Sequence, residues 1–166
     1  MVVYFYGQTK HYGYFSNFYL SKFRINASVI GKSEEIEVNC AEQAIMWLKA
    51  ILMGDLISAN KIAVETNPAI CKRYGRQVKP FDESKWLKYR DAIAFEVLRL
   101  KFQDPQLKQW LLETGNEILA EASSQDKIWG IGISVSAAIR GEKWNGQNLL
   151  GNTLMNVRQN INLSDK

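Results

Sequence analysis

The spacing of apolar residues along the chain changes near residue 40. Before that point, β-branched and aromatic residues cluster or alternate in short runs, which is typical of strands. After it, apolar residues recur every three or four positions, which is typical of helices. The first part predicts a strand at residues 2–6, a loop at 7–17, and a hairpin with strands at 23–30 and 35–38.

The remaining chain predicts mainly helices. Asp55, the pair Asn67-Pro68 and the pair Asp104-Pro105 each stand directly before an apolar periodic run. Asp and Asn cap helix N-termini, and Pro suits the first helical position. The predicted helices span residues 41–53, 56–64, 68–75, 85–102, 105–112 and 149–161, with a strand at 118–122 and a loop or short strand at 128–133.

The length and the order of these segments bound the fold class. A chain of 166 residues suits one domain, and no linker or repeat divides it. Strands first, helices in the middle and a mixed tail indicate an α+β arrangement. We therefore expect a predominantly helical α+β domain over residues 1–166, with a small β-hairpin or sheet at its N-terminal end.

The sequence favours a cytoplasmic location. Its first residues lack the basic region and long apolar stretch of a signal peptide. No segment approaches the ~20 apolar residues of a membrane span. Cys40 and Cys71 are far apart and form no paired pattern. We expect reduced thiols and no membrane partner.

The net charge and the metal-ligating residues limit which ligands and metals the protein is expected to bind. The formal net charge of +4 favours anionic ligands such as phosphates, but no basic tract points to a nucleic-acid protein. His11 is the single histidine, so a zinc or iron site would depend on carboxylates, an unusual ligand set for these metals. We expect no metal and no cofactor, with a carboxylate-bound Mg²⁺ left open.

The first predicted helix carries an acid and an amine on one stripe. Glu42, Met46 and Lys49 are spaced by four and then three residues, so they lie on one face. Apolar surroundings would lower the pKa of the lysine and raise that of the glutamate, and a neutral lysine is a nucleophile toward carbonyl carbons. Taken alone, a solvent-facing stripe of an amphipathic helix explains the same pattern.

A second candidate segment follows the strand at 118–122. Glu121 and Asp126 are two nearby carboxylates, and Trp129 could stack on a base. Gly130 permits close approach of the backbone to a ligand. The competing interpretation is a tight loop in which Asp126 forms an Asx turn and Trp129 is core.

The start of the last helix is a candidate phosphate site. The helix N-terminus after residues 146–151 would offer free N–H groups, with Asn148 as a cap or a donor to phosphate. Arg158 lies deeper in the same helix. A plain structural cap is the competing interpretation.

An aromatic loop near the N-terminus holds one more candidate. Ser16 and Asn17 form a polar pair between aromatic residues and could bind a ribose or the edge of a base. The competing interpretation is an ordered loop that packs its rings.

Several short motifs occur in a characteristic order. In chain order they are Phe15-Ser-Asn-Phe, Ala41-Glu-Gln with Lys49-Ala50, Trp86, Lys101-Phe102, Glu121-Ala-Ser with Asp126 and Trp129-Gly130, and Asn148-Leu-Leu-Gly151 with Leu154-Met155 and Arg158. This order resembles the NADAR family, whose YbiA-like members are N-glycosidases. The resemblance runs from about Tyr4 to Arg158.

The resemblance implies an enzyme that hydrolyses a ribose–nitrogen bond. By position, the glutamate of the family falls on Glu42 and its catalytic lysine on Lys49. Trp86, Asp126 and Trp129 fall on pocket positions of the family. The chain departs from the family pattern at Gln43, Ala44 and Ile131, where relatives carry aromatic, histidine or acidic residues.

Three functions follow as alternatives. The first is hydrolysis of the ribosylamino-pyrimidine phosphate intermediates of riboflavin synthesis, the second removal of ADP-ribose from guanine in nucleic acid, and the third ADP-ribose or nucleotide binding without turnover. In the catalytic cases Lys49 forms a Schiff base with C1 of the sugar, while Glu42 or Asp126 moves protons. A carboxylate that activates water against C1 is the alternative mechanism.

Overall fold

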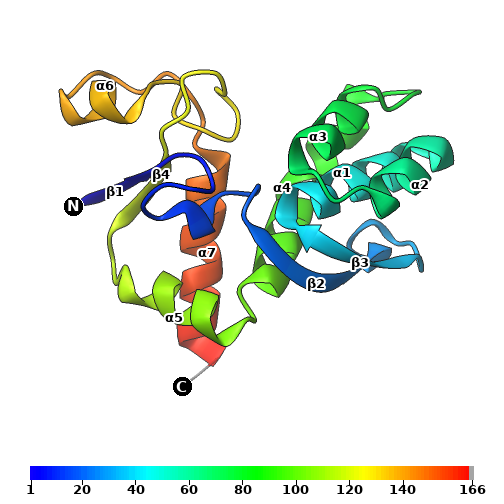
Figure 1. The fold of residues 1–166 in the computed structure, drawn as a ribbon, viewed down its shortest axis with the longest axis horizontal. Coiled ribbons are helices and arrows are strands. Elements are labelled where there is room, and N and C mark those ends of the chain that lie inside the picture. Colours follow the sequence, from blue (N-terminus) through cyan, green and yellow to red (C-terminus); the bar gives the residue numbers. More distant parts are fainter. Residues whose placement is uncertain (165–166) are drawn as a thin grey trace. The chain divides into compact units, whose positions relative to one another are not determined.

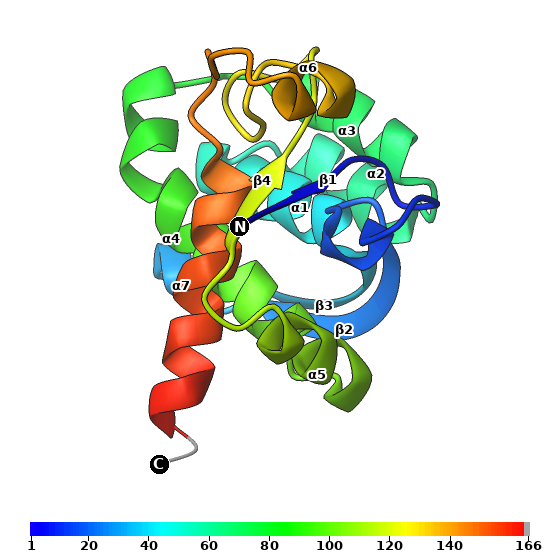
Figure 2. The same ribbon diagram turned by 90° about the vertical axis from the view of Figure 1, so that its left-hand side faces the viewer.

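The chain folds into two compact units. The computed structural model describes residues 1–164, of which 162 and 164 are described by their backbone alone. The terminal unit consists of residues 1–19 and the chain from Phe102 onward, and the middle unit is Leu20–Lys101. Helices dominate both ribbons in Figures 1 and 2, and the expected α+β, mainly helical class is confirmed.

The predicted hairpin forms the sheet of the middle unit, with shifted bounds. Strand β2 spans Leu20–Asn26 and pairs antiparallel with β3, which spans Glu35–Cys40. The expected strand at 23–30 was wrong in its second half, where Ala27–Ile30 form a 3₁₀ turn, η2. The side chain of Asn26 accepts a hydrogen bond from the backbone two residues on, and Gly31 ends the turn with a φ of 72°. These two residues stop the strand.

Helix α1 is the buried centre of the middle unit. It spans Ala41–Met53, as predicted, and each of its residues is buried except Lys49, which is half-buried. The helices α2 (Leu56–Val64), α3 (Pro68–Arg76) and α4 (Glu83–Lys101) contact it. The interpretation of a solvent-facing stripe is therefore wrong, because α1 has no solvent-facing side.

The start of α1 is locked by side chains. The thiol of Cys40 caps the helix and accepts a hydrogen bond from the backbone of Gln43 at 3.4 Å. The buried side chain of Gln43 accepts from the N–H of Asn39 at 2.7 Å and donates to the carbonyl of Ile62 at 2.9 Å. Gln43, a departure from the family pattern, thus ties α1 to the end of α2.

Helix α3 approaches α1 through a glycine. A Cβ added at Gly75 would lie 1.9 Å from Sδ and 2.7 Å from Cγ of Met46. Met46 stands between Glu42 and Lys49 on the stripe of α1. Gly75 therefore brings the C-terminal end of α3, at Arg76, close to this stripe.

The segment between α3 and α4 is anchored through its backbone. The predicted cap Asp55 accepts a hydrogen bond from the backbone of Ser58 at 3.0 Å, which confirms the start of α2. The same carboxylate accepts from the N–H of Lys79 at 2.9 Å. The N–H of Asp82 donates to Sδ of Met53 at 3.4 Å. Both ends of residues 79–82 are thus held to the α1–α2 junction.

The terminal unit is built on a pair of parallel strands. Strand β1 (Val2–Phe5) pairs with β4 (Ile118–Glu121), residue Val2 opposite Ile118. Helix α7 spans Leu149–Ser164 and contacts β4. A Cβ at Gly151 would lie 2.1 Å from the carbonyl oxygen of Leu119, so a glycine lets α7 lie directly on the strand.

The shorter helices of this unit were only partly predicted. Helix α5 spans Pro105–Glu113 and is capped by Asp104, as expected. A 3₁₀ turn, η1, spans Gly13–Phe15 in the predicted loop. Helix α6 (Val135–Ile139) was missed because five residues are too few to show a period, although Ser134 caps it. Among residues 1–164 no helix has the length and apolar content to cross a membrane.

Arg158 connects α7 with the chain between α5 and β4. Its guanidinium is buried and donates to Oγ1 of Thr114 at 2.5 Å and to the carbonyl of Glu117 at 2.9 Å. Burial lowers the pKa of this guanidinium, and the nearby Glu117 partly opposes the effect. These bonds give Arg158 a structural role within the terminal unit.

The first prediction concerns the contact between α3 and α1. We expect Gly75→Ala to lower the free energy of unfolding by about 1–3 kcal/mol, because the added methyl group overlaps Met46. Urea denaturation of the purified protein measures the change. Arg73→Ala, at an exposed position of α3, should change it by less than about 0.5 kcal/mol. Equal effects of the two substitutions would contradict the tight packing at Gly75.

The second prediction concerns Arg158. Arg158→Met should destabilise the ligand-free protein by about 1–3 kcal/mol, because Thr114 and the carbonyl of Glu117 lose their donor. Thermal unfolding without any added anion tests this, with Gln159→Ala at an exposed position of α7 as the control. An unchanged stability would indicate that Arg158 is kept for a ligand instead.

Candidate functional site

The residues expected to form the site lie in both units. Glu42, Lys49 and Trp86 belong to the middle unit. The terminal unit holds the other seven: Ser16, Asn17, Asp126, Trp129, Gly130, Asn148 and Arg158.

In the middle unit, the structure brings an amine close to two aromatic rings. Nζ of Lys49 lies 4.8 Å from the ring centre of Phe81 and 5.6 Å from that of Trp86. Trp86 stands in the first turns of α4, and Phe81 in the anchored segment before it. We call Glu42, Lys49, Arg76, Phe81 and Trp86 the Lys49 site.

The surroundings of Lys49 lower its pKa. Burial is the main cause, because a half-buried ammonium loses part of its hydration. The negative charge of Glu42 opposes this shift, and the positive charge of Arg76 adds to it. A larger share of Lys49 is therefore neutral at a given pH than of an ordinary lysine, and only the neutral amine is a nucleophile.

Glu42 supplies an acid on the same helix. It is 8% exposed and lies in the first turn of α1, where the helix dipole favours a negative charge. Lys49 stands seven positions further along the chain, which is roughly 10 Å along the helix axis. A buried carboxyl group and a half-buried amine on one rigid helix can serve as a proton carrier and a nucleophile for one reacting centre.

In the terminal unit, Asp126 and Trp129 form a tight turn. Oδ1 of Asp126 accepts hydrogen bonds from the backbone of Ile128 at 2.9 Å and of Trp129 at 2.8 Å. A Cβ at Gly130 would lie 2.9 Å from the carbonyl oxygens of Glu121 and Asp126. The close approach that this glycine permits is thus made by the protein's own backbone. The competing interpretation is right about the Asx turn at Asp126, but Trp129, which it placed in the core, is only half-buried.

The N-terminus of α7 is bonded within the protein. The N–H groups of residues 148–150 donate to the carbonyls of residues 128–130, at 3.0–3.1 Å. The side chain of Asn148 accepts from the N–H of Glu121 at 3.1 Å and donates to the carbonyl of Leu119 at 2.9 Å. The phosphate role expected for Asn148 needs free donors at these positions, so this geometry argues against it.

The aromatic loop near the N-terminus contains an unused acceptor. Asn17 is 6% exposed, and its Oδ1 has no hydrogen-bond partner among residues 1–164. Buried polar atoms are nearly always bonded, so such an atom calls for an explanation such as a ligand. Oγ of Ser16 accepts from the backbone of Phe18 at 3.1 Å. Oδ1 of Asn17 is thus an acceptor to which a hydroxyl group of a ligand can donate.

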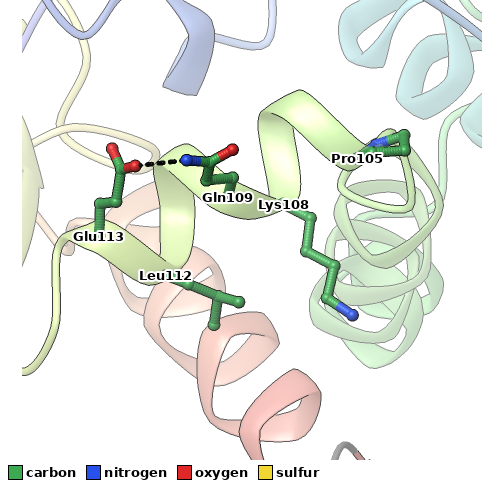
Figure 3. Close-up of a pocket in the computed structure, with 5 residues that line it drawn as sticks. All are labelled: Pro105, Lys108, Gln109, Leu112 and Glu113. Carbon is green, nitrogen blue, oxygen red and sulfur yellow. Dashed lines mark hydrogen bonds between the residues drawn. The ribbon is translucent and has the colours of Figure 1, made fainter.

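A hollow of about 540 Å³ lies on one side of α5 (Figure 3). Pro105, Lys108 and Leu112 line it, together with Gln109, whose amide donates to Glu113 at 2.9 Å. None of the expected site residues lines this hollow. It offers no arrangement of acid, base and nucleophile around a reacting centre, so we assign no function to it.

Metal-binding groups do not gather in the described chain. Within residues 1–164, no three side chains of His, Cys, Asp or Glu lie close enough together to hold a metal ion. The expectation that the protein works without a metal stays a prediction.

Sequence reasoning missed two members of the Lys49 site. The sequence alone did not assign Arg76 or Phe81 to a site. Their relation to Lys49 depends on the contact of Gly75 with Met46 and on the anchored segment 79–82. The one local signal was the position of Phe81 between Pro80 and Asp82, whose Oδ1 accepts a hydrogen bond from the N–H of Lys85 at 2.9 Å at the start of α4.

Known proteins share both the sequence and the fold. An N-glycosidase of Acanthamoeba polyphaga mimivirus is 42% identical over 141 residues, which cover 82% of this chain and 83% of that protein. A riboflavin biosynthesis protein of Vibrio vulnificus is 26% identical over 160 residues, which cover 96% of this chain and 38% of that protein. The name of the viral relative confirms the expected class of enzyme, a hydrolase that acts on N-glycosyl bonds.

The structural comparison agrees with the sequence comparison. The NMR structure of the Escherichia coli protein YbiA aligns with a TM-score of 0.78 and 24% identity, covering 99% of this chain and 86% of that chain, which shows the shared fold. The family model described as the NADAR domain matches residues 4–162. The chain therefore belongs to the NADAR domain family.

Proposed function

We propose that this protein hydrolyses the bond between C1 of a phosphorylated ribose and an amine nitrogen of a pyrimidine, with Lys49 as the nucleophile. One observation carries the proposal: Lys49 is the only residue of α1 that is not buried, and its amine lies beside two aromatic rings and has a lowered pKa. The similarity to a riboflavin biosynthesis protein supports ribosylamino-pyrimidine phosphates as the substrate.

The reaction proceeds in two steps. The sugar ring of such a substrate opens to an imine between C1 and the amine nitrogen. Neutral Nζ of Lys49 adds to C1, the bond from C1 to the pyrimidine amine breaks, and a new imine joins the sugar to Lys49. Water then adds to C1 and releases the free sugar phosphate and the lysine amine, so one water is consumed in each turnover.

Glu42 moves the protons in this scheme. The pyrimidine amine needs a proton as it leaves, and the attacking water must lose one. A carboxyl group can perform both transfers in turn because it is regenerated after each cycle. Its buried position on the rigid helix α1 fixes it relative to Lys49.

Arg76 suits the phosphate group of the substrate. It is exposed at the end of α3 and close enough to Lys49 to affect its pKa. Its positive charge at the edge of the Lys49 site favours an anionic ligand. The guanidinium of Arg76 takes the role that the sequence suggested for Arg158, whose bonds go to Thr114 and Glu117.

The domain organisation forms part of this proposal. The NADAR family model covers both units, from residue 4 to residue 162. We therefore treat residues 1–166 as one NADAR domain.

The third prediction tests the reaction. Lys49→Ala and Glu42→Gln should each lower kcat/KM for a ribosylamino-pyrimidine phosphate by at least about 100-fold, the typical size of a lost nucleophile or proton carrier. Mass spectrometry of the released pyrimidine measures turnover. Borohydride should trap the sugar on wild-type Lys49 as a stable amine, because the mechanism contains an imine.

The control variant is Lys61→Ala, whose lysine contacts Tyr74 on another part of the middle unit. It should keep wild-type activity. An active Lys49→Ala enzyme would show that Lys49 is not the nucleophile. Turnover without a trapped adduct would favour water activation by a carboxylate. Turnover of ADP-ribosylated guanine alone would show that the proposed substrate is wrong. Binding of either substrate without turnover would show that the protein is a binding protein and not an enzyme.

The fourth prediction concerns the pKa of Lys49. Acylation of Lys49 by an amine-specific reagent, followed by mass spectrometry, should reach half its maximal rate below pH 10.5, the ordinary lysine value. Arg76→Gln should move this midpoint to higher pH, because the charge of Arg76 lowers the pKa of Lys49. Arg73→Gln, on an exposed position of the same helix, should leave it unchanged. A midpoint that falls in Arg76→Gln would contradict the charge arrangement.

A further inference from the structure

Phe81 is the aromatic residue nearest to the nucleophile. Its ring centre is 4.8 Å from Nζ of Lys49, closer than that of Trp86 at 5.6 Å. The side chain is 47% exposed, although it is large and apolar. A single exposed phenylalanine is ordinary on a protein surface, so its exposure alone indicates nothing. Its position beside Lys49 makes the exposure informative.

The ring is held where it is by its own segment. Val78, three residues earlier, is buried. The N–H of Lys79 is bonded to Asp55, and the N–H of Asp82 is bonded to Met53. Phe81 lies between these two anchors, so the backbone that carries its ring is held in place near Lys49.

The two rings suit the chemistry that Lys49 performs. The protonated amine is attracted to the faces of Phe81 and Trp86, and that attraction disappears when the amine is neutral. The ring faces are then available to another partner. The leaving group of an N-glycoside with a pyrimidine is a flat ring bonded to the carbon that Lys49 attacks, and flat bases stack on aromatic side chains.

We propose that Phe81 binds the planar leaving group of the substrate and thereby selects N-glycosides of aromatic amines over those of aliphatic amines. This inference rests on the proposed function of Lys49. Phe81 recognises the ring of the base, whereas the ribose and the phosphate are recognised elsewhere. Replacing it should therefore affect the binding of the base and leave the binding of the sugar phosphate unchanged.

The test compares two substitutions at one position. Phe81→Leu keeps an apolar side chain but removes the ring, and Phe81→Tyr keeps the ring. Calorimetry measures the binding of the free aminopyrimidine and, separately, of ribose 5-phosphate to each purified full-length variant. Phe81→Leu should weaken aminopyrimidine binding by about five- to tenfold, at the lower end of the effect of one stacking ring. Phe81→Tyr should stay near the wild type.

Ribose 5-phosphate provides the internal control. Its affinity should be the same in the wild type, Phe81→Leu and Phe81→Tyr. Leu56→Ala removes an apolar side chain of similar exposure, 59%, from helix α2 of the middle unit and should change neither affinity. Unchanged aminopyrimidine binding in Phe81→Leu, or an equal loss for both ligands, would overturn the role of Phe81, as would a wild type that binds no aminopyrimidine.

The two proposals fail in different ways. Binding of the free base needs no chemistry, so it decides on Phe81 even when Lys49→Ala retains activity. Conversely, suppose that Lys49→Ala loses all activity while Phe81→Leu binds the base as the wild type does. That result would support Lys49 as the nucleophile and contradict the role of Phe81 in selectivity. Kinetics adds a second readout: Phe81→Leu should raise KM for the pyrimidine substrate about five- to tenfold and change kcat by less than about twofold.

Discussion

The burial of α1 on every side is the constraint on which the middle unit depends. A helix of 13 residues that is apolar almost throughout must be covered by its neighbours, and β3, α2, α3 and α4 all contact it. Lys49 is the exception on this helix, and it remains half-buried. The burial that stabilises the unit is also what lowers the pKa of Lys49, so stability and reactivity have one physical origin here.

Much of this unit could be predicted from local signals. The helix at residues 41–53 has the predicted bounds because its apolar run is continuous and Gly54 ends it with a φ of 76°. Asp55 and Asn67 cap helices because their side chains act on the next few backbone N–H groups. Such short-range effects are visible in a sequence. The same pattern did not show that α1 is covered on all sides, because coverage is decided by segments far away in the chain.

The terminal unit shows the opposite case. Glycines and an asparagine at the start of α7 suggested a place for a phosphate, and the residue types are right for one. In the structure these residues instead join the loop at residues 128–130, strand β4 and helix α7. The side chain of Asn148 is bonded to the backbone of both Leu119 and Glu121 in β4. A sequence displays donors but not what they are bonded to. The sequence therefore identified the motif at the start of α7 but not its role, because that role depends on bonding partners far away in the chain.

The anchoring of residues 79–82 has an evolutionary consequence. Lys79 and Asp82 are fixed through their backbone N–H groups, which every residue except proline possesses. The side chain at position 81 contributes to neither bond, so its identity can drift without loosening the segment. A substitution at position 81 changes the side chain beside the amine of Lys49, while the two backbone hydrogen bonds that anchor the segment are retained. This arrangement would let related enzymes diversify their substrates by single substitutions, with few compensating changes elsewhere.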